Sequence, residues 1–425
     1  MFSVSAQEDG KPFVIVGAGL AGGNAAASLR EEGFEGRVVL IGREPGVPFG
    51  RPPLSKTYLR SEEDLEGWYV KPADWWDEND VERLEATVAA VDPAAHKVVL
   101  ESGEEISYEK VLIATGARNR PFEIPGAELS GIHQLRSVAE CEAIKGEAAA
   151  GRHALVVGMS FIGCEVAASL TQLGVRVTAA FPQTVPLERV LGEELGSAIG
   201  AIHRAEGVEL LPETHIASFA GEERVEAAVT SEGDRIDCDF AVVGIGVKPD
   251  LPSFASPVDQ ENGLTVDERC RASAADVYSA GDVANQLHPR FGRVRVEHYN
   301  NGEKMGRYAA RSMLGSTDPY DYLHTFWSDQ YEHKLEYVGH ATEWDEFLVR
   351  GSLEEKKLIG FYMKEGRIEA AAGLDRGGDP ELDTDGEMAA CAQLVATRAH
   401  PDRDRLVDDA VDLWALAEEA GSPAR

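Results

Sequence analysis

The sequence predicts an α/β fold with two separate βαβ units, followed by a smaller α+β domain. A strand, a glycine-rich turn, a helix and a second strand begin near Phe13, and the same order returns at His153. From about Pro319 the pattern changes to aromatic, strand-like runs separated by acidic turns. At 425 residues the chain is too long for one ordinary domain, so two or three are expected.

The first βαβ unit begins with the apolar run Phe13–Val16, which predicts a buried strand. Ala21, Ala25 and Leu29 then recur at helical spacing, and residues 37–41 predict the next strand. The second unit repeats this order, with strands predicted over 154–157 and 175–181 and a helix over 165–173 closed by Gly174. A repeat this long is not a solenoid period, so it indicates two domains of one kind.

Shorter signatures fill the rest of the chain. Three further strands, each ending in glycine or just after it, are predicted over residues 111–116, 240–246 and 277–282. In the last domain, strands are predicted over 325–331 and 358–363, a polar loop over 377–386, and helices over 389–397 and 406–420. The predicted domains are residues 1–120 together with 248–318, residues 121–247, and residues 319–425.

The first turn has the pattern Gly17-x-Gly19-x-x-Gly22, with Leu20 and Ala21 between the last two glycines. The first glycine permits the tight turn, the second lets the backbone approach a pyrophosphate, and the third lets helix and strand pack closely. The helix N-terminus then faces the phosphate charge. Glu44, just past the second strand, suits ribose hydroxyls. These features predict a Rossmann-like, dinucleotide-binding domain rather than a glycine turn without a ligand.

The second turn keeps the first and third glycines, but serine replaces the middle one. Its residues are Gly158, Ser160, Phe161, Ile162 and Gly163, and Gly244, Ile245 and Gly246 follow a later strand. Serine is small, so this turn predicts a nicotinamide nucleotide site; a degenerate structural copy is the alternative. Phe181 and Gln183 stand where an acidic residue usually binds the ribose, and no arginine pair for a 2′-phosphate is present, although Arg189 is near. NAD(H) is therefore only modestly favoured over NADP(H).

Composition excludes several other classes of protein. No apolar run of about 18 residues exists, so no membrane-spanning segment is expected. The stretch Met1–Pro12 is polar and acidic, which disfavours a secretory signal and makes the cytoplasm the default location. The five cysteines are scattered without a C-x-x-C pair, and the histidines show no metal-ligand spacing, so neither a disulfide scaffold nor a metal site is expected.

The charge is strongly unbalanced, with 74 acidic against 41 basic residues and a net charge of −33. Such a surface repels nucleic acids and anionic membranes. It is either an ordinary solvated acidic shell or an adaptation to high salt, which screens the repulsion. Arg290, Arg293, Arg295 and Lys304 could form a local basic patch for an acidic partner, or could only balance nearby carboxylates.

The motif Phe49-Gly-Arg-Pro-Pro-Leu-Ser-Lys56 resembles the flavin-site motif of the NAD(P)H:ferredoxin reductases. These are FAD-dependent pyridine nucleotide oxidoreductases of the putidaredoxin and rubredoxin reductase type, with a glutathione-reductase-like fold. Residues 114–117, 280–283 and 326–330 fit the same family, and the resemblance covers nearly the whole chain. The stretches 156–163, 185–192 and 337–344 resemble a branch close to apoptosis-inducing-factor-like proteins.

The resemblance implies a role for each matching residue. Lys56 should lie at flavin N5, paired with Glu165, where a cation stabilises reduced flavin and a carboxylate offsets its desolvation; a plain surface pair is the alternative. The implied FAD contacts are the first turn, Glu44, Arg51, Lys56, Val88, Thr115, Gly116, Arg136, Gly281, Asp282, Glu297, His298, Tyr299 and Trp327. The implied nucleotide contacts are the second turn, Glu165, Phe181, Gln183, Arg189 and Gly244 to Gly246.

The absence of cysteine near the predicted flavin site indicates how electrons should leave the flavin. No cysteine stands between Glu44 and Lys56, where thiol-dependent relatives of such flavoproteins carry one or two, so thiol relay chemistry is not expected. Electrons should leave the flavin singly, to a [2Fe–2S] ferredoxin or Rieske-type protein, from a monomer or homodimer. Two alternatives stay open: an NADH oxidase or quinone reductase, and a redox sensor like apoptosis-inducing factor that responds to NADH.

Overall fold

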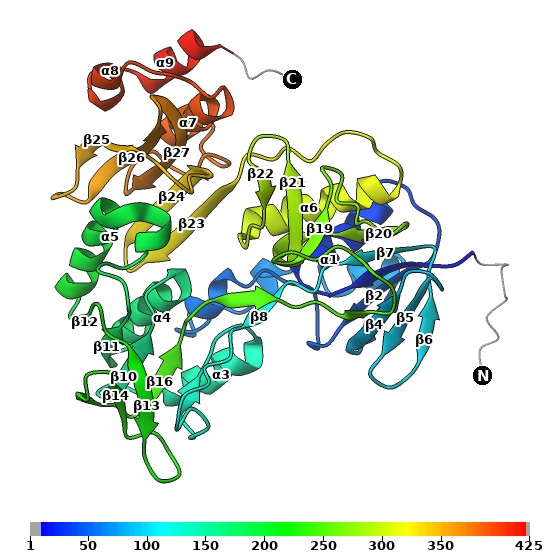
Figure 1. Cartoon of the computed structure of the whole chain (residues 1–425), viewed down its shortest axis with the longest axis horizontal. Helices are drawn as coiled ribbons and strands as arrows, with labels where there is room; N and C mark the ends of the chain where they lie inside the picture. The colour runs from blue at the N-terminus through cyan, green and yellow to red at the C-terminus, as the bar shows by residue number, and fades with distance from the viewer. Residues whose placement is uncertain (1–9, 422–425) are drawn as a thin grey trace. The chain divides into compact units, whose positions relative to one another are not determined.

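The computed structural model describes residues 10–421 (Figure 1). The chain forms two compact units. Of the described residues, the first contains 10–52, 64–118 and 247–322, and the second contains 53–63, 119–246 and 323–421. Most of the stretch Met1–Pro12, on which the expectation of no secretory signal depends, lies outside the described residues. No helix of the described part is long and apolar enough to cross a membrane.

The first unit is built on a five-stranded parallel sheet in the order β20-β7-β1-β2-β3. These strands are β1 Phe13–Val16, β2 Val38–Gly42, β3 Val81–Glu85, β7 Lys110–Ile113 and β20 Val277–Ser279. Ile15 and Leu40 face a core shared with helices α1 (Leu20–Glu31) and α6 (Tyr299–Met313), whereas Val14 and Val39 face a second core. Burial on both faces explains why these strands are continuous apolar runs.

Smaller elements complete the first unit. They are 3₁₀ helices η2 Glu66–Trp68 and η3 Gly281–Val283, helix α2 Trp75–Glu78, and strands β4 Val88–Asp92, β5 Lys97–Leu100, β6 Glu105–Ser107, β18 Ser253–Phe254, β19 Leu264–Val266, β21 Ala284–His288 and β22 Gly292–Val294. The sheet β18-β4-β5-β6 packs against the second core, and β19-β21-β22 is a separate sheet. The 3₁₀ helix η1 (Pro52–Ser55) lies where the chain passes from the first unit to the second. Strands β8 (Ala117–Asn119) and β17 (Val247–Pro249) lie at two further passages of this kind and pair as a two-stranded sheet.

The second unit repeats the parallel arrangement in a sheet of order β12-β11-β10-β16-β9. Its strands are β9 Ile132–His133, β10 His153–Val157, β11 Arg176–Ala180, β12 Glu209–Leu211 and β16 Phe240–Val243, with helices α3 Val138–Glu147, α4 Phe161–Gln172 and α5 Glu188–Ala205. A three-stranded antiparallel sheet is formed by β13 Ile216–Ala220, β14 Ala227–Thr230 and β15 Arg235–Asp237.

The last quarter of the chain forms an antiparallel sheet in the order β23-β24-β27-β26-β25 (Figure 1). Its strands are β23 Thr325–Gln330, β24 His333–Gly339, β25 Glu346–Ser352, β26 Lys357–Lys364 and β27 Arg367–Leu374. Helices α7 (Glu387–Ala396), α8 (Arg403–Val407) and α9 (Leu413–Ala420) cover it. Short turns join most of the strands, so the sheet forms largely from neighbouring parts of the chain.

Two sequence predictions about helices are wrong in detail. Helix α4 begins at Phe161, four residues before the predicted start, because Ser160 already occupies the N-cap position. The helix predicted over 406–420 is two short helices, α8 and α9, with a break at residues 408–412. Asp412 starts α9 by accepting a hydrogen bond from the backbone N–H of Trp414.

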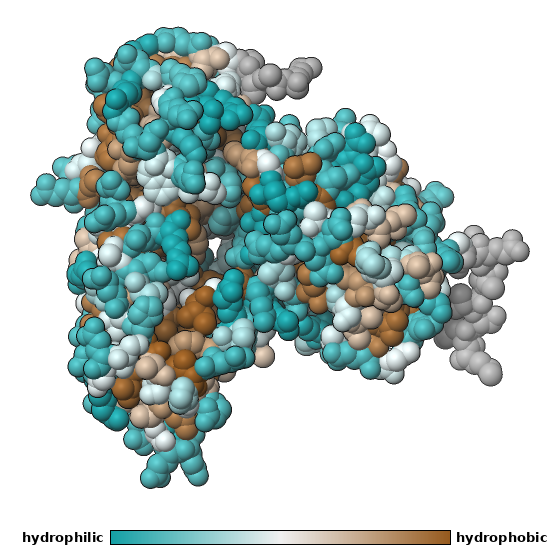
Figure 2. Space-filling model, in the orientation of Figure 1, coloured by the Kyte–Doolittle hydropathy of each residue, from teal (hydrophilic) through white to brown (hydrophobic). Residues whose placement is uncertain are grey.

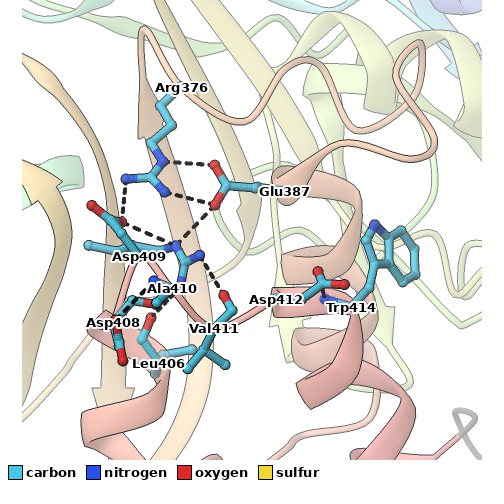
Figure 3. Close-up of polar contacts among 10 residues, drawn as sticks. Arg376, Glu387, Leu406, Asp408, Asp409, Ala410, Val411, Asp412 and Trp414 are labelled. Atoms are coloured by element: carbon cyan, nitrogen blue, oxygen red, sulfur yellow. Dashed lines mark hydrogen bonds and ion pairs between the residues drawn. The ribbon is translucent and has the colours of Figure 1, made fainter.

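The break in this last helix has a clear physical cause, and Figure 3 shows Leu406, Asp408 and Val411 at the break. The guanidinium of Arg350, on β25, donates to the backbone carbonyls of Leu406, Asp408 and Val411. These carbonyls would otherwise be free to accept intrahelical bonds. Arg350 also pairs with Glu387, which Arg376 binds through two nitrogens. The buried arginine therefore holds the C-terminal segment on the sheet in a non-helical conformation.

We expect Arg350→Met to destabilise the second unit by about 3 kcal/mol, because three backbone carbonyls would lose the donor that the buried arginine supplies. Urea unfolding followed by the fluorescence of the six tryptophans, Trp414 among them, measures the loss. Arg405→Met is the matched control, since the Arg405–Glu419 pair is exposed and should be worth less than about 1 kcal/mol. Equal effects of the two substitutions would contradict the assignment.

Candidate functional site

The first glycine turn combines two glycines that the fold requires with one that it does not. Gly17 has φ +113°, and a Cβ there would lie 2.2 Å from the carbonyl oxygen of Ala114. A Cβ on Gly22 would lie 1.8 Å from the carbonyl oxygen of Gly17. Gly19 is different, because its φ of −84° is open to any residue and a Cβ would meet no protein atom within 4 Å. The open space at Gly19 lies at the N-terminus of α1, where a pyrophosphate would bind.

Three further predicted residues gather around this turn. Thr115 follows β7, and its buried hydroxyl has no hydrogen-bond partner among the described residues. Gly281 has φ +76°, and a Cβ there would be 2.9 Å from the Cβ of Ala21. This close approach brings Asp282 to the first turn of α1. The Thr115 hydroxyl, which has no partner among the described residues, and the open space at Gly19 both fit a dinucleotide bound at the helix N-terminus.

The close crossing of α6 over α1 was not foreseen from the sequence. A Cβ on Gly306 would lie 2.3 Å from the carbonyl oxygen of Ala21, and one on Gly302 would meet Leu20 at 3.4 Å. Two glycines four residues apart therefore let the helices pack backbone to backbone. The spacing Gly302-x-x-x-Gly306 was the available signal, and it holds the N-terminal half of α1 in place.

The remaining predicted FAD residues of the first unit form a second group. Arg51 Nη2 lies 2.6 Å from Glu44 Oε2, so the two side chains form an ion pair. Tyr299 packs over Gly50, where a Cβ would lie 2.4 Å from its ring, and makes an edge contact with Trp68. His298 is the N-cap residue of α6, and Glu297 pairs with Arg295. Val88 lies half-buried at the start of β4 and packs against the second core.

The second glycine turn has the same geometry as the first. Gly158 has φ +96°, and a Cβ there would lie 2.5 Å from the carbonyl oxygen of Gly244, so the turn faces the residues that follow β16. Ser160 has φ −84° and ψ −170°, close to the values of Gly19, and is exposed without capping α4. The backbone at this position therefore tolerates serine. Phe161, Ile162 and Gly163 form the first turn of α4.

The three residues predicted near the ribose at this turn differ in how far they are exposed to solvent. Phe181 is fully buried, so its side chain belongs to the core. Gln183 is half-buried, and its carbonyl accepts a hydrogen bond from the backbone N–H of Glu213. Arg189 is exposed, in the first turn of α5. Only Gln183 and Arg189 of these three have side chains reachable from solvent.

The predicted ion pair is present within the second unit. Lys56 Nζ lies 2.8 Å from Glu165 Oε2, and the two side chains are 12% and 7% exposed. Ser55 donates to the same Glu165 oxygen, and Ser169 of α4 donates to the carbonyl of Ser55. The segment 53–63 is thereby held on α4. The two side chains are more deeply buried than those of a plain surface pair, which remain solvated.

Ser328 and Asp329, which lie near the pair, were not assigned roles from the sequence, although their motif was noticed. Ser328 of β23 donates to Glu165 Oε1 at 2.8 Å. Burial raises the pKa of Asp329, while the nearby Lys56 opposes this shift. Trp327 lies half-buried on the same strand, and the backbone N–H of Arg136 donates to Glu140 before α3. The run Phe326–Gln330 was the signal that could have identified these neighbours.

Glu336 lies opposite Trp327 on β24. Burial, together with the negative charges of Asp379 and Asp329, raises its pKa to about 8. Between the ordinary value near 4.5 and 8, the folded protein keeps this proton and the unfolded chain does not. Stability must therefore fall as the pH rises through this window.

The cysteines are unsuited to redox chemistry. All five are free and buried. Burial raises the thiol pKa of Cys141 and Cys238 to about 12 and that of Cys164, Cys270 and Cys391 well above the usual range. A thiolate is the reactive form, so these side chains are inert at neutral pH. In the described part of the chain no group of histidine, cysteine and carboxylate side chains could hold a metal.

Known proteins with similar sequences point in one direction. Residues 11–306 match the family model of pyridine nucleotide-disulphide oxidoreductases, and residues 325–417 match the reductase C-terminal model. Rhodocoxin reductase of Rhodococcus erythropolis is 38% identical over 80% of this chain and 81% of its own length. The ferredoxin–NAD(+) reductase component of the anthranilate 1,2-dioxygenase system of Burkholderia cepacia is 35% identical, over 95% of this chain and 98% of its own.

Solved structures agree with the sequence matches. The covalent complex of putidaredoxin reductase with putidaredoxin contains a chain similar at a TM-score of 0.90 and 28% identity, with 97% of this chain and 99% of that chain covered. The ferredoxin reductase of the CYP199A2 system from Rhodopseudomonas palustris has a TM-score of 0.89 and 30% identity, covering 96% and 100%. Both similarities span the two glycine turns and the C-terminal sheet.

Gly19→Ala should lower FAD affinity at least tenfold while leaving the fold intact, because the added methyl group meets only the space that the pyrophosphate needs. Flavin absorbance after dialysis and far-UV circular dichroism measure the two effects. Gly146→Ala is the control, since Gly146 is exposed and also has open space around it. Full retention of FAD by Gly19→Ala would show that this turn does not bind the phosphates.

Glu336→Gln should stabilise the protein more at pH 9 than at pH 5.5, because the substitution removes the cost of ionising a buried carboxyl. Apparent melting temperatures of both proteins, recorded at equal ionic strength at the two pH values, measure the difference. A gain that is the same at both pH values would contradict the raised pKa of Glu336.

Proposed function

Because this chain belongs to the pyridine nucleotide-disulphide oxidoreductase family, we propose that it takes hydride from NAD(P)H onto FAD and passes single electrons to a ferredoxin. Family membership confirms the predicted resemblance and the predicted fold class. The relatives named above include reductases whose names specify ferredoxin, and they match along nearly the full length. The resemblance to an apoptosis-inducing-factor-like branch is not borne out by these relatives and stays a prediction.

The proposal of one-electron transfer rests mainly on the burial of all five cysteines. A disulphide-reducing member of such a family needs a reactive thiol, and every cysteine of this chain is buried with a raised thiol pKa. Electrons therefore have no covalent route outward through sulfur. Residues 325–417 match the reductase C-terminal model, and Cys391, the one cysteine among them, is buried.

FAD, when bound, supplies the chemistry of accepting a hydride and releasing electrons one at a time. The chain's own residues bind and orient. The first glycine turn and the N-terminus of α1 would hold the pyrophosphate, with Thr115 and Asp282 beside it. Lys56 would place a positive charge at the flavin, and Glu165 holds the ammonium in position. These assignments rest on the resemblance and on the burial of the pair.

The second glycine turn is the proposed nicotinamide nucleotide site, with NADH preferred. Phe181 is buried, and Arg189 is the first basic residue after the end of β11. A 2′-phosphate is usually bound by an arginine at this strand end, often as one of a pair. A single exposed arginine supports a preference for NADH that is modest in size.

The proposed electron acceptor is a [2Fe–2S] ferredoxin or Rieske-type protein. Much of the visible surface is hydrophilic (Figure 2), and the net charge is −33, so an acidic partner must find a local basic area. Arg293 donates to the carbonyls of Val266 and Asn285, and Arg295 pairs with Glu297. Two of the four candidate basic residues therefore serve the fold, which favours charge balance over a patch. Five free cysteines suit a reducing compartment, and the proposed location is the cytoplasm.

Stopped-flow spectroscopy of the purified, FAD-loaded protein tests this function. NADH should bleach the flavin band near 450 nm about tenfold faster than NADPH, because no arginine pair compensates a 2′-phosphate. Two molecules of a [2Fe–2S] ferredoxin should then be reduced per NADH, each by one electron. Oxygen uptake without ferredoxin that equals the rate with ferredoxin would instead indicate an NADH oxidase. No bleaching with either nucleotide would overturn the proposal.

A further inference from the structure

The second unit contains a continuous chain of hydrogen bonds that ends on the buried carboxylate of Glu165. Ser328 Oγ donates to Glu165 Oε1 at 2.8 Å, and Gln330 Nε2 donates to Ser328 Oγ at 3.3 Å. His203 Nε2 lies 2.9 Å from Gln330 Oε1, and His203 Nδ1 lies 3.1 Å from the hydroxyl of Tyr331. The chain links α4, α5 and the turn after β23, and it leads from Glu165 to a half-buried tyrosine.

All donors in this chain point the same way. Burial lowers the pKa of His203 to about 4, so its imidazole is neutral at neutral pH. Gln330 presents its carbonyl oxygen to Nε2, which therefore carries the ring proton, and Nδ1 accepts from the hydroxyl of Tyr331. The amide of Gln330 then donates to Ser328, and Ser328 to Glu165. Each bond polarises the next, which stabilises a negative charge at the Glu165 end.

The burial of this chain indicates that it has a purpose beyond packing. Ser328 is 1% exposed, Gln330 2% and His203 0%. Buried polar groups are costly if any partner is missing, so an apolar contact would join the same elements at less risk. Such a contact already exists, because the ring of Phe161 packs on Phe326 with centroids 5.0 Å apart. The polar chain is therefore not needed to hold β23 on α4.

The end of the chain is also conformationally specified. Tyr331 adopts a left-handed backbone conformation with φ +56°, which is uncommon for an aromatic residue. Its ring centroid lies 5.4 Å from that of His203. The unfavourable backbone conformation is retained where the tyrosine hydroxyl reaches the imidazole.

We propose that Ser328, Gln330, His203 and Tyr331 are positioning residues for the Lys56–Glu165 pair, and that they set how strongly this pair favours reduced flavin. Glu165 Oε2 accepts from Ser55 and pairs with Lys56, and Oε1 accepts from Ser328. Both oxygens are thus oriented, and the ammonium is held in one place. This inference deepens the proposed function and rests on it.

Other charged groups surround the two ends of the chain and belong in its pH dependence. Asp329 of β23 feels the charges of Lys56, Glu165, Lys334 and Arg60. At the other end, the charge of Glu206 and the thiol of Cys164 act on Tyr331, whose pKa is raised mainly by burial. Because none of these surrounding groups is altered in Ser328→Ala, Gln330→Met or Thr178→Val, they contribute equally to those three proteins.

The experiment uses the FAD-loaded protein and two variants that interrupt the chain at different points, Ser328→Ala and Gln330→Met. Thr178→Val is the matched control, because Thr178 is equally buried and joins His153 to Glu209 in a similar histidine–hydroxyl–carboxylate chain away from Glu165. Lys56→Met is the reference for complete loss of the pair. Retained FAD and an unchanged circular dichroism spectrum show that each variant folds.

Three readouts are measured on each protein. The first is the midpoint potential of bound FAD, which does not depend on turnover. The second is the rate of flavin reduction by NADH from pH 5.5 to 9, and the third is the imidazole ¹⁵N shift of His203, which reports which ring nitrogen carries the proton. A tenfold weaker preference for reduced flavin corresponds to about −30 mV in a two-electron potential.

The proposal expects Ser328→Ala and Gln330→Met each to lower the potential by about 30 mV and to shift the acid limb of the rate profile upward by about one pH unit. Gln330→Met should also change the tautomer of His203. Thr178→Val should match the wild type in all three readouts. Unchanged potentials and profiles in both chain variants, or the same changes in Thr178→Val, overturn it. If NADH fails to reduce the wild type, the proposed function itself has failed.

Discussion

A buried carboxylate in the second glycine-turn domain is the constraint on which most of the site depends. Glu165 is 6% exposed and lies in the first turns of α4, immediately after the turn that is proposed to bind the nucleotide. A charge at this depth is tolerated only if it is paired and hydrogen-bonded. Lys56, Ser55 and Ser328 provide these partners from two further segments of the chain. Segment 53–63 and strand β23 therefore each supply polar partners to one charge on α4, and apolar packing already holds β23 there.

The two glycine turns share one backbone geometry but differ in the residue at the middle position. In both turns the first and third glycines are required because a Cβ would collide with backbone atoms of the chain itself. The middle position is required only by the ligand, since its backbone torsions are ordinary in both Gly19 and Ser160. This distinction explains why serine can replace the middle glycine without damage to the fold. It also explains why a fingerprint with one departure still predicted a Rossmann-like turn.

The sequence predicted the elements whose signal is local and missed those that depend on distant partners. Strands β1, β10 and β16 are apolar because both faces of a parallel sheet are covered, so their runs were visible directly. The Lys56–Glu165 pair was predicted only through family resemblance, because 109 positions separate the two residues and no periodicity links them. The break at residues 408–412 was missed because its cause, Arg350, lies more than 50 residues away. His203 was missed for the same reason, since its partners belong to a different domain.

The hydrogen-bond chain gives the C-terminal sheet a part in redox chemistry that its sequence match alone does not describe. A family member with a reactive thiol can tune electron transfer through the ionisation of that thiol. This chain has only buried, protonated thiols, so the electrostatic field at the flavin must come from fixed charges and dipoles. Ser328 and Gln330 are the residues of the C-terminal sheet that reach Glu165, directly or through one hydroxyl. In a reductase whose thiols are all buried, the C-terminal domain would then also adjust the ion pair on which the proposed flavin reduction depends.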